Sequence, residues 1–261
     1  MITRNLEKAR EAFLKRDKKL SKSAHNSSSG KEKHKKEGKY IKSAVYGGLD
    51  GIITTFAVVA GVAGASLSAG IVLILGFANL IADGISMAVG DFLSTKAENE
   101  YNRAERKREE WEVDNYSEGE KKEVFEIYRD KGMSKKDALK MTNILSKNKK
   151  AWVNFMMTEE LKIIESEESP LKNSVVTFSS FCIFGLIPLL AYLFSGISFF
   201  TKNTFLIACF MTVLTLFLLG SAKTKVTGRN WIKSGLETVL VGGFASGAAY
   251  LIGYLLQGLA G

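Results

Sequence analysis

The sequence contains five long apolar stretches that are separated by strongly charged segments. These stretches cover roughly residues 44–65, 70–92, 173–195, 203–222 and 235–257. A run of about 20 apolar residues is long enough to cross a bilayer as a helix. The last three stretches contain a single charged side chain, that of Glu237. The pattern therefore predicts an all-α membrane protein with five spans.

Lysine and arginine are distributed very unevenly among the segments that flank these stretches. Residues 1–42 contain 14 of them, residues 92–172 contain 17 and residues 223–233 contain four, whereas the 196–202 loop contains only Lys202. Because basic segments stay in the cytosol, we expect the N-terminus and residues 92–172 to be cytoplasmic and the C-terminus to lie outside. This topology also accounts for the net charge of +9, so we do not expect a nucleic-acid partner.

Charge and hydropathy together divide the chain into four regions. These are a basic cytoplasmic tail at 1–42, spans one and two at 43–93, a cytoplasmic helical domain inserted between spans two and three at 94–172, and spans three to five at 173–261. Within the tail, the polar residues 21–39 are typical of a disordered linker.

The segment after span two has the sequence features of a helical domain. No proline or glycine occurs between Phe92 and Tyr116, so we expect the helix of span two to continue out of the membrane as one long rod. Capping and turn residues predict three further helices. They cover residues 118–131 with Ser117 as N-cap, 135–147 with Ser134 as N-cap, and 151–167.

Spans one and two contain polar side chains at membrane depth, among them Asp50 and Asp83. A carboxylate in hydrocarbon costs about 2.5–3.5 kcal/mol even on the lenient insertion scale, so it usually marks a substrate or ion path. Asp50 and Thr54 lie one helical turn apart in span one. Oxygen ligands with one thioether suit a divalent transition metal better than an alkali ion. One face of span two supplies both kinds at four-residue intervals: Asn79, Asp83, Met87 and Asp91.

The predicted helical domain is rich in glutamates at helical spacing. Two interpretations remain open from the residues alone, metal binding or a solvated face, because 18 acidic residues accompany 17 basic ones across residues 92–172. Adjoining methionine thioethers favour an iron-like or copper-like ion over calcium or magnesium. The side chains concerned are Glu105, Glu109 and Glu112 on the rod, Glu120 and Glu123 on the next helix, and Met156, Met157, Glu159 and Glu160 on the last.

Several motifs resemble those of the vacuolar iron transporter family, and the resemblance covers about residues 42–257. The most specific is ANLIADGISMAVGDFLSTKAE at 78–98, because few other five-span proteins join such a helix to a glutamate-rich segment. The others are Gly48-Leu49-Asp50-Gly51 with Phe56, Trp152-Val153-Asn154-Phe155-Met156-Met157 followed by Glu159-Glu160-Leu161, and SGAAYLIG at 246–253.

The resemblance implies a homodimeric transporter that moves ferrous iron, with manganese as a further cargo, out of the cytosol in exchange for protons. The path would run between the two copies of spans one and two, where Asp50 and Met87 match the family's metal residues. The metal is cargo, and no prosthetic group is expected. A vacuolar or acidic-organelle membrane is implied for a eukaryotic source and the plasma membrane for a bacterial one. A cytoplasmic metal-binding domain would be formed by Glu109, Glu112, Glu120, Glu123, Met156, Met157 and Glu160.

Two features of the first two spans leave alternatives open. Some family members have a glutamate eight residues before the span-two methionine, where this chain has Asn79. We expect Asp83, one turn further on, to take over its role, which leaves proton stoichiometry and metal preference undecided. The small residues Gly47 and Gly51 would let a second helix approach closely, either within the chain or from a symmetry mate.

A second class of function competes with transport. The alternative is a membrane-anchored metal sensor or buffer that does not move metal across the bilayer. The two differ at Asp50, because only a transporter needs an acid at membrane depth. An enzyme is not expected, because the sequence has no nucleophile–base pair, phosphate-binding loop or zinc-protease motif.

Overall fold

The computed structural model describes residues 6–26, 40–164, 168–196, 203–224 and 230–259. The chain divides into two compact units, Met1–Lys42 and Ser43–Gly261. The first contains α1 (Leu6–Lys15) and α2 (Lys18–Asn26), which contact each other. The Asp17 carboxylate accepts from the backbone N–H of Lys19 and so caps α2. The prediction of a disordered linker from residue 21 is therefore wrong as far as Asn26, and its remainder, 27–39, lies outside the described residues.

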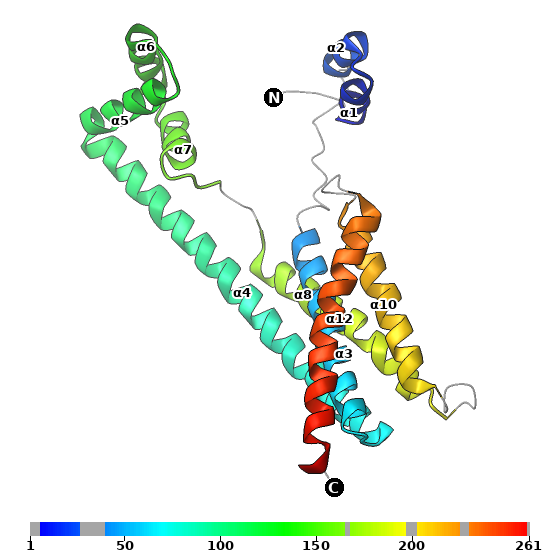
Figure 1. Ribbon diagram of the computed structural model, residues 1–261. Coiled ribbons are helices and arrows are strands. Elements are labelled where there is room, and N and C mark those ends of the chain that lie inside the picture. The colour runs from blue at the N-terminus through cyan, green and yellow to red at the C-terminus, as the bar shows by residue number, and fades with distance from the viewer. Residues whose placement is uncertain (1–5, 27–39, 165–167, 197–202, 225–229, 260–261) are drawn as a thin grey trace. The chain divides into compact units, whose positions relative to one another are not determined.

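The second unit contains the membrane-length helices. Among the described residues, five helices are long and apolar enough to cross a bilayer, and no strand is present in the same part of the chain. The prediction of an all-helical chain with five spans is thereby confirmed (Figure 1). A short 3-10 helix, η2 (Gln257–Leu259), follows the last of them. The five helices are α3 (Ile41–Gly64), α4 (Ala69–Asn115), α8 (Pro170–Leu193), α10 (Thr204–Ala222) and α12 (Trp231–Leu256).

Helix α4 is one uninterrupted helix of 47 residues, about 70 Å long at 1.5 Å per residue. Its apolar half packs along α8, and its far end contacts α5 (Ser117–Asp130) and α7 (Lys149–Glu159) (Figure 1). Without a proline or glycine to stop it, the helix runs on until Tyr116 leaves helical geometry. The predicted continuation of span two as a rod is confirmed. The rod physically links the membrane-length helices to the helices that follow it.

The spans pack closely at small residues. On α3, Gly47 and Gly51 lie directly against the backbone of Thr177 and Phe181 on α8. A side chain at Gly51 would overlap the Phe181 carbonyl oxygen, which explains why this contact requires glycine. In this structure the two glycines pack within the chain. An apolar core forms around these contacts from buried residues of four spans, including Phe56, Val72, Phe181, Leu189 and Ala208.

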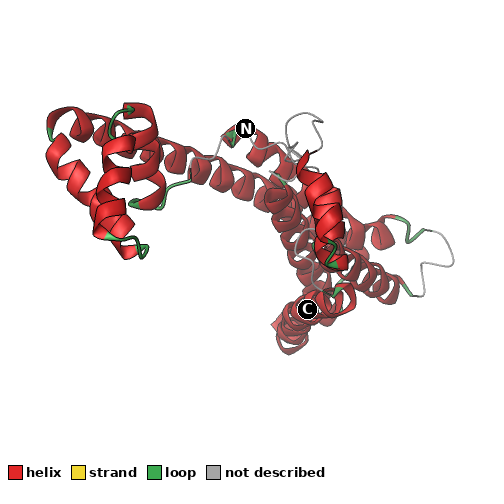
Figure 2. Ribbon diagram, turned by 90° about the horizontal axis from the view of Figure 1, so that it is seen from above, coloured by secondary structure: helices red, strands yellow, loops and turns green. Residues whose placement is uncertain are grey.

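Three shorter helices, α5 (Ser117–Asp130), α6 (Lys135–Leu145) and α7 (Lys149–Glu159), follow the rod (Figure 2). Together with the end of α4 they enclose a second core. Ion pairs join Lys149 of α7 to Asp114 of α4 and Lys131, just after α5, to Glu159 of α7. The second core consists of Val113, Val124, Trp152, Val153, Met156 and Met157.

The ends of these helices test the capping predictions. Ser134 caps α6 as predicted, since its hydroxyl accepts from the Asp137 N–H. Ser117 does not cap α5, because it is already helical and Tyr116 occupies the cap position without a side-chain bond. The last helix ends at Glu159 and not at 167. It stops there because Lys162 adopts a left-handed backbone (φ 56) while the N–H groups of Leu161 and Ile163 turn back onto carbonyls of the last turn.

Candidate metal centres

The predicted site residues fall into two groups that share helix α4. Met87 lies in its apolar half and Glu109 in its distal half. At 1.5 Å per residue these positions are about 33 Å apart along the helix axis. One ion cannot contact both groups. We call them the intramembrane group, around Asp50 and Met87, and the glutamate cluster, around Glu109.

The intramembrane group places acids of two helices next to each other. Asp50 on α3 and Asp83 on α4 are both half-buried, and their carboxylates are close enough to interact electrostatically. The Asn79 side-chain N–H₂ is buried and has no hydrogen-bond partner among the described residues. Two acids and an amide with free bonding capacity form a polar patch that can hold a cation or a proton.

The remaining predicted members of this group are less closely associated. Met87 packs against the apolar core of the spans, one turn after Asp83. The Thr54 hydroxyl donates to the backbone carbonyl of Asp50 at 2.8 Å and not to its carboxylate. The hydroxyl proton of Thr54 is therefore used in a bond to its own helix, and only the lone pairs of the hydroxyl oxygen remain available to a ligand.

Asp91, at the end of the polar face of α4, belongs to a hydrogen-bond network whose other members the sequence reasoning missed. Its carboxylate accepts from Thr177 of α8 at 2.5 Å and from Thr95 at 3.4 Å. Asn173 of α8 donates to Thr95 at 3.2 Å and to Glu168 at 2.9 Å. The network fixes the orientation of Asp91. The sequence does indicate this network, because the polar residues Asn173 and Thr177 lie one helical turn apart at the start of an otherwise apolar span.

The glutamate cluster brings together acids from the rod and the next helix. One carboxylate oxygen each from Glu109, Glu112 and Glu120 lie within 4.8 Å of one another. Glu109 and Glu120 are buried, with relative exposures of 1% and 4%. One oxygen of each, Oε2, has no hydrogen-bond partner among the described residues. Buried carboxylate oxygens without partners are costly, and a metal ion would satisfy them.

The other predicted members of the cluster come from α5 and α7. Glu123 and Glu160 interact electrostatically with Glu120. Both are exposed to solvent. Met156 and Met157, in contrast, are fully buried in the core beside the cluster. The structure therefore brings the five glutamates into one acidic neighbourhood, and it packs both thioethers among apolar side chains.

Three acids of the cluster have raised pKa values. Burial, followed by repulsion from Glu123 and Glu109, raises the pKa of Glu120 to about 7. Although Glu160 as a whole is exposed, partial burial of its carboxyl group and the charges of Glu109 and Glu123 raise its pKa to about 7 as well. The pKa of Glu109 is also raised, mainly by burial and Glu112, although Arg108 opposes this shift. Near neutral pH the empty cluster thus holds protons that a divalent cation would release.

The raised pKa of Glu120 predicts a pH-dependent stability of the metal-free protein. Because its folded pKa of about 7 lies above the ordinary value of 4.5, the folded state binds more protons between these values. The contribution of Glu120 to stability is therefore most favourable below pH 4.5 and is lost as the pH rises through 7. Glu120→Gln removes this penalty and should stabilise the metal-free protein at pH 8 by on the order of 2 kcal/mol.

Thermal unfolding of the full chain in chelator, from pH 5 to pH 8, measures this effect. Glu118→Gln is the matched control, because Glu118 lies on the same helix with its side chain 86% exposed. The control should follow the wild-type curve. A Glu120→Gln protein that is no more stable than wild type at pH 8 would show that the ionised carboxylate of Glu120 does not destabilise the folded protein.

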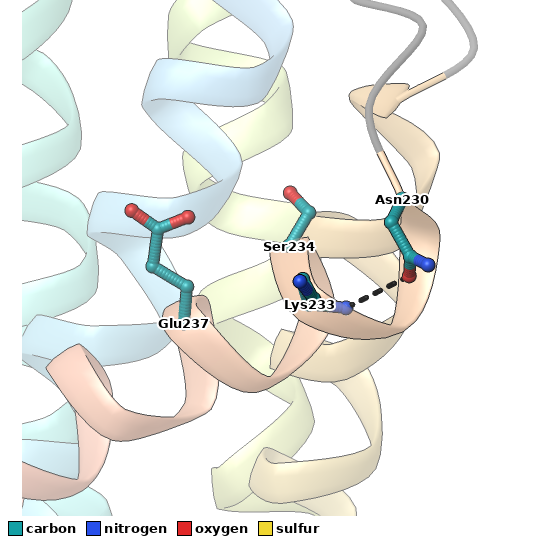
Figure 3. A pocket seen from close by; sticks show the side chains of 4 residues that line it. All are labelled: Asn230, Lys233, Ser234 and Glu237. Carbon is teal, nitrogen blue, oxygen red and sulfur yellow. Dashed lines mark hydrogen bonds between the residues drawn. The ribbon is translucent and has the colours of Figure 1, made fainter.

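A pocket of about 250 Å³ lies at the start of α12, and none of its lining residues, Asn230, Lys233, Ser234 and Glu237, is a predicted site residue (Figure 3). The Asn230 side chain accepts from the backbone N–H groups of Ile232 and Lys233 and caps the helix. Its carbonyl oxygen is thus used by the fold. Glu237 is exposed and is an acid of a predicted span that is not among the predicted path residues.

Comparison with known proteins gives a consistent result. A model of the VIT family matches residues 41–254. The chain is 43% identical to a vacuolar iron transporter of Toxoplasma gondii, with 97% of this chain and 89% of the relative aligned. It is 37% identical to a vacuolar iron transporter of Plasmodium falciparum, covering 98% of both chains. It is 33% identical to vacuolar iron transporter 1 of Arabidopsis thaliana, covering 87% and 90%.

Proposed function

The chain belongs to the VIT family, and on that premise we propose that it moves ferrous iron out of the cytosol in exchange for protons. Its relatives are named as transporters, so the prediction of a transporter and not an enzyme is confirmed. Transport of a metal ion across a membrane follows from this membership. The direction of transport, the counter-transported proton and manganese as a second cargo are the proposed parts.

The observation that carries the proposal is the pairing of two acidic groups on one continuous helix. The glutamate cluster offers unpartnered buried oxygens, and the intramembrane group lies about 33 Å away along α4. A sensor or buffer needs only the first group. An acid pair at membrane depth, Asp50 with Asp83, serves a cation that enters the membrane.

The chemistry of each group suits its place in such a cycle. Glutamate oxygens of the cluster would capture the cation and release protons, because the pKa values of Glu120 and Glu160 are raised to about 7. In the membrane, Asp50 would neutralise the ion and take up a proton when it leaves, and Met87 would supply a soft ligand that favours iron. Neither group contains histidine or cysteine, which keeps metal binding weak enough for release.

The arrangement in the membrane follows from the same proposal. The basic segments at 1–42 and 92–172 would lie in the cytosol, and with them the glutamate cluster. Two copies would form a homodimer with the path between their α3 and α4 helices. Vacuolar relatives support an acidic organelle as the location, where a proton gradient would drive metal into the lumen.

Metal binding by the cluster can be tested in the full-length protein. Replacing Glu109 and Glu120 together by glutamine keeps the side-chain shape and removes two buried charges. We expect Mn²⁺ affinity at the cluster to fall by at least 100-fold, since truncating ligands or their partners typically costs 10–100-fold each. Counting free Mn²⁺ by electron paramagnetic resonance measures this binding.

Asp50→Asn is introduced in all samples so that the intramembrane group does not contribute. The control replaces Glu118 and Glu126 of α5, which are both exposed, by glutamine and also removes two charges. It should bind Mn²⁺ nearly as well as the parent. Equal binding by all three proteins would mean that Glu109 and Glu120 do not bind metal.

A further inference from the structure

One guanidinium group faces three carboxylates at the edge of the glutamate cluster. The side chain of Arg108 on α4 contacts Glu105 at 2.9 Å, Glu109 Oε1 at 3.5 Å and Glu112 Oε2 at 3.6 Å. Two of these partners, Glu109 and Glu112, also contribute to the group of oxygens within 4.8 Å of one another. Arg108 therefore shares its carboxylate partners with the candidate metal centre.

The contacts divide the two oxygens of Glu109 between two roles. Arg108 approaches Oε1, while the buried Oε2 has no partner among the described residues. The Arg108 side chain is 50% exposed, whereas that of Glu109 is 2% exposed. The cation is thus at the solvent edge, where it can rotate away at little cost, and its anionic partner is fixed in the interior.

We propose that Arg108 is a built-in counter-ion of the empty glutamate cluster, which an arriving divalent cation displaces, and that it thereby loosens metal binding. The proposal rests on the proposed function, because it requires the cluster to bind metal. A metal ion that takes Glu109 and Glu112 as ligands competes with the Arg108 guanidinium for the charge of both carboxylates and also repels it toward solvent. Both effects weaken the bound state. They favour release of the ion from the cluster.

The test measures Mn²⁺ affinity of the full-length protein at pH 8, where proton competition is smallest. Arg108→Gln should tighten binding on the order of tenfold, as expected for removing one partly solvated charge next to a divalent ion. Arg108→Lys keeps the positive charge but lacks the planar guanidinium group, so the Mn²⁺ affinity of this variant should stay close to that of wild type. The matched control is Arg103→Gln, an exposed arginine on the same helix, which should change affinity by less than about twofold.

The sign of the change separates the proposal from a structural role. If Arg108 only stabilised the helix, its removal would weaken metal binding. The proposal is overturned if Arg108→Gln binds Mn²⁺ more weakly than wild type. It is also overturned if Arg108→Gln has no larger effect than Arg103→Gln. Folding of each variant is verified by circular dichroism, and Arg108→Met replaces Arg108→Gln if the latter is unstable. The Glu109 and Glu120 double variant is measured in parallel. If it binds Mn²⁺ like wild type, the proposed function of the cluster fails instead.

Discussion

Asp50→Asn is expected to abolish metal transport and to leave the protein folded. Asparagine is nearly isosteric with aspartate, and the change removes a charge from the membrane interior. The amide can neither neutralise a divalent cation nor take up a proton when the cation leaves. We therefore expect iron flux into liposomes to fall to the level of protein-free vesicles, with the elution volume of the purified protein unchanged.

Glu237→Gln is the matched control for this substitution. It also removes an acid from a predicted span, but Glu237 lies on α12 and lines a pocket that includes none of the predicted path residues (Figure 3). Its flux should equal that of wild type. A folded Asp50→Asn protein that still moves iron at the wild-type rate would reduce Asp50 to a helix-packing residue and remove it from the path.

Gly253→Ala is expected to disrupt the packing of α12 on α3 and to lower the yield of folded protein sharply. A Cβ at this position would overlap the backbone carbonyl oxygen of Gly61. Backbone atoms cannot rotate away as a side chain can, so the cost should reach the upper end of the ~1–3 kcal/mol typical of overpacking, or exceed it. Thermal stability in detergent and the monodisperse fraction on size exclusion report the effect.

The same helix offers a control with the opposite expectation. A Cβ at Gly243 meets nothing within 4 Å. Alanine is the better helix former by roughly 1 kcal/mol, so Gly243→Ala should leave stability unchanged or raise it. Equal behaviour of the two variants would show that α3 and α12 are not in close contact at Gly253.

The spans and the rod could be predicted from the sequence because each follows from local composition. Apolar runs of membrane length dictate helices, since every backbone polar group must be satisfied within the segment. The rod continues because nothing between Phe92 and Tyr116 stops it. The glutamate spacing likewise predicted which side chains share a face, and the structure brings Glu109, Glu112 and Glu120 together.

Other features depend on contacts that local sequence does not encode. The end of α7 is set by the left-handed conformation of Lys162, a residue with no turn preference of its own. The partner of Asp91 is Thr177, 86 residues away in the chain. The role of Arg108 could not be predicted, because Arg108 and Glu112 have the i,i+4 spacing of an ordinary surface ion pair. Only the burial of Glu109, which Arg108 also contacts, distinguishes this pair from an ordinary one.

Capture of metal without transport is the strongest competing account. A membrane-anchored sensor or buffer would also show Mn²⁺ binding at the glutamate cluster and the pH-dependent stability of Glu120. It would not need the adjacent acids Asp50 and Asp83 at membrane depth. Binding measurements therefore support both accounts equally, and flux separates them.

The most direct test is iron flux with simultaneous measurement of pH in liposomes that contain the wild-type protein. The lumen is made acidic relative to the outside and holds a pH dye and a fluorescent iron chelator, and ferrous iron is added outside. Exchange predicts that iron enters, that the lumen becomes more alkaline as it does so, and that collapsing the gradient slows iron entry. Iron entry that is independent of the gradient and causes no pH change, or binding with no entry at all, would contradict metal–proton exchange.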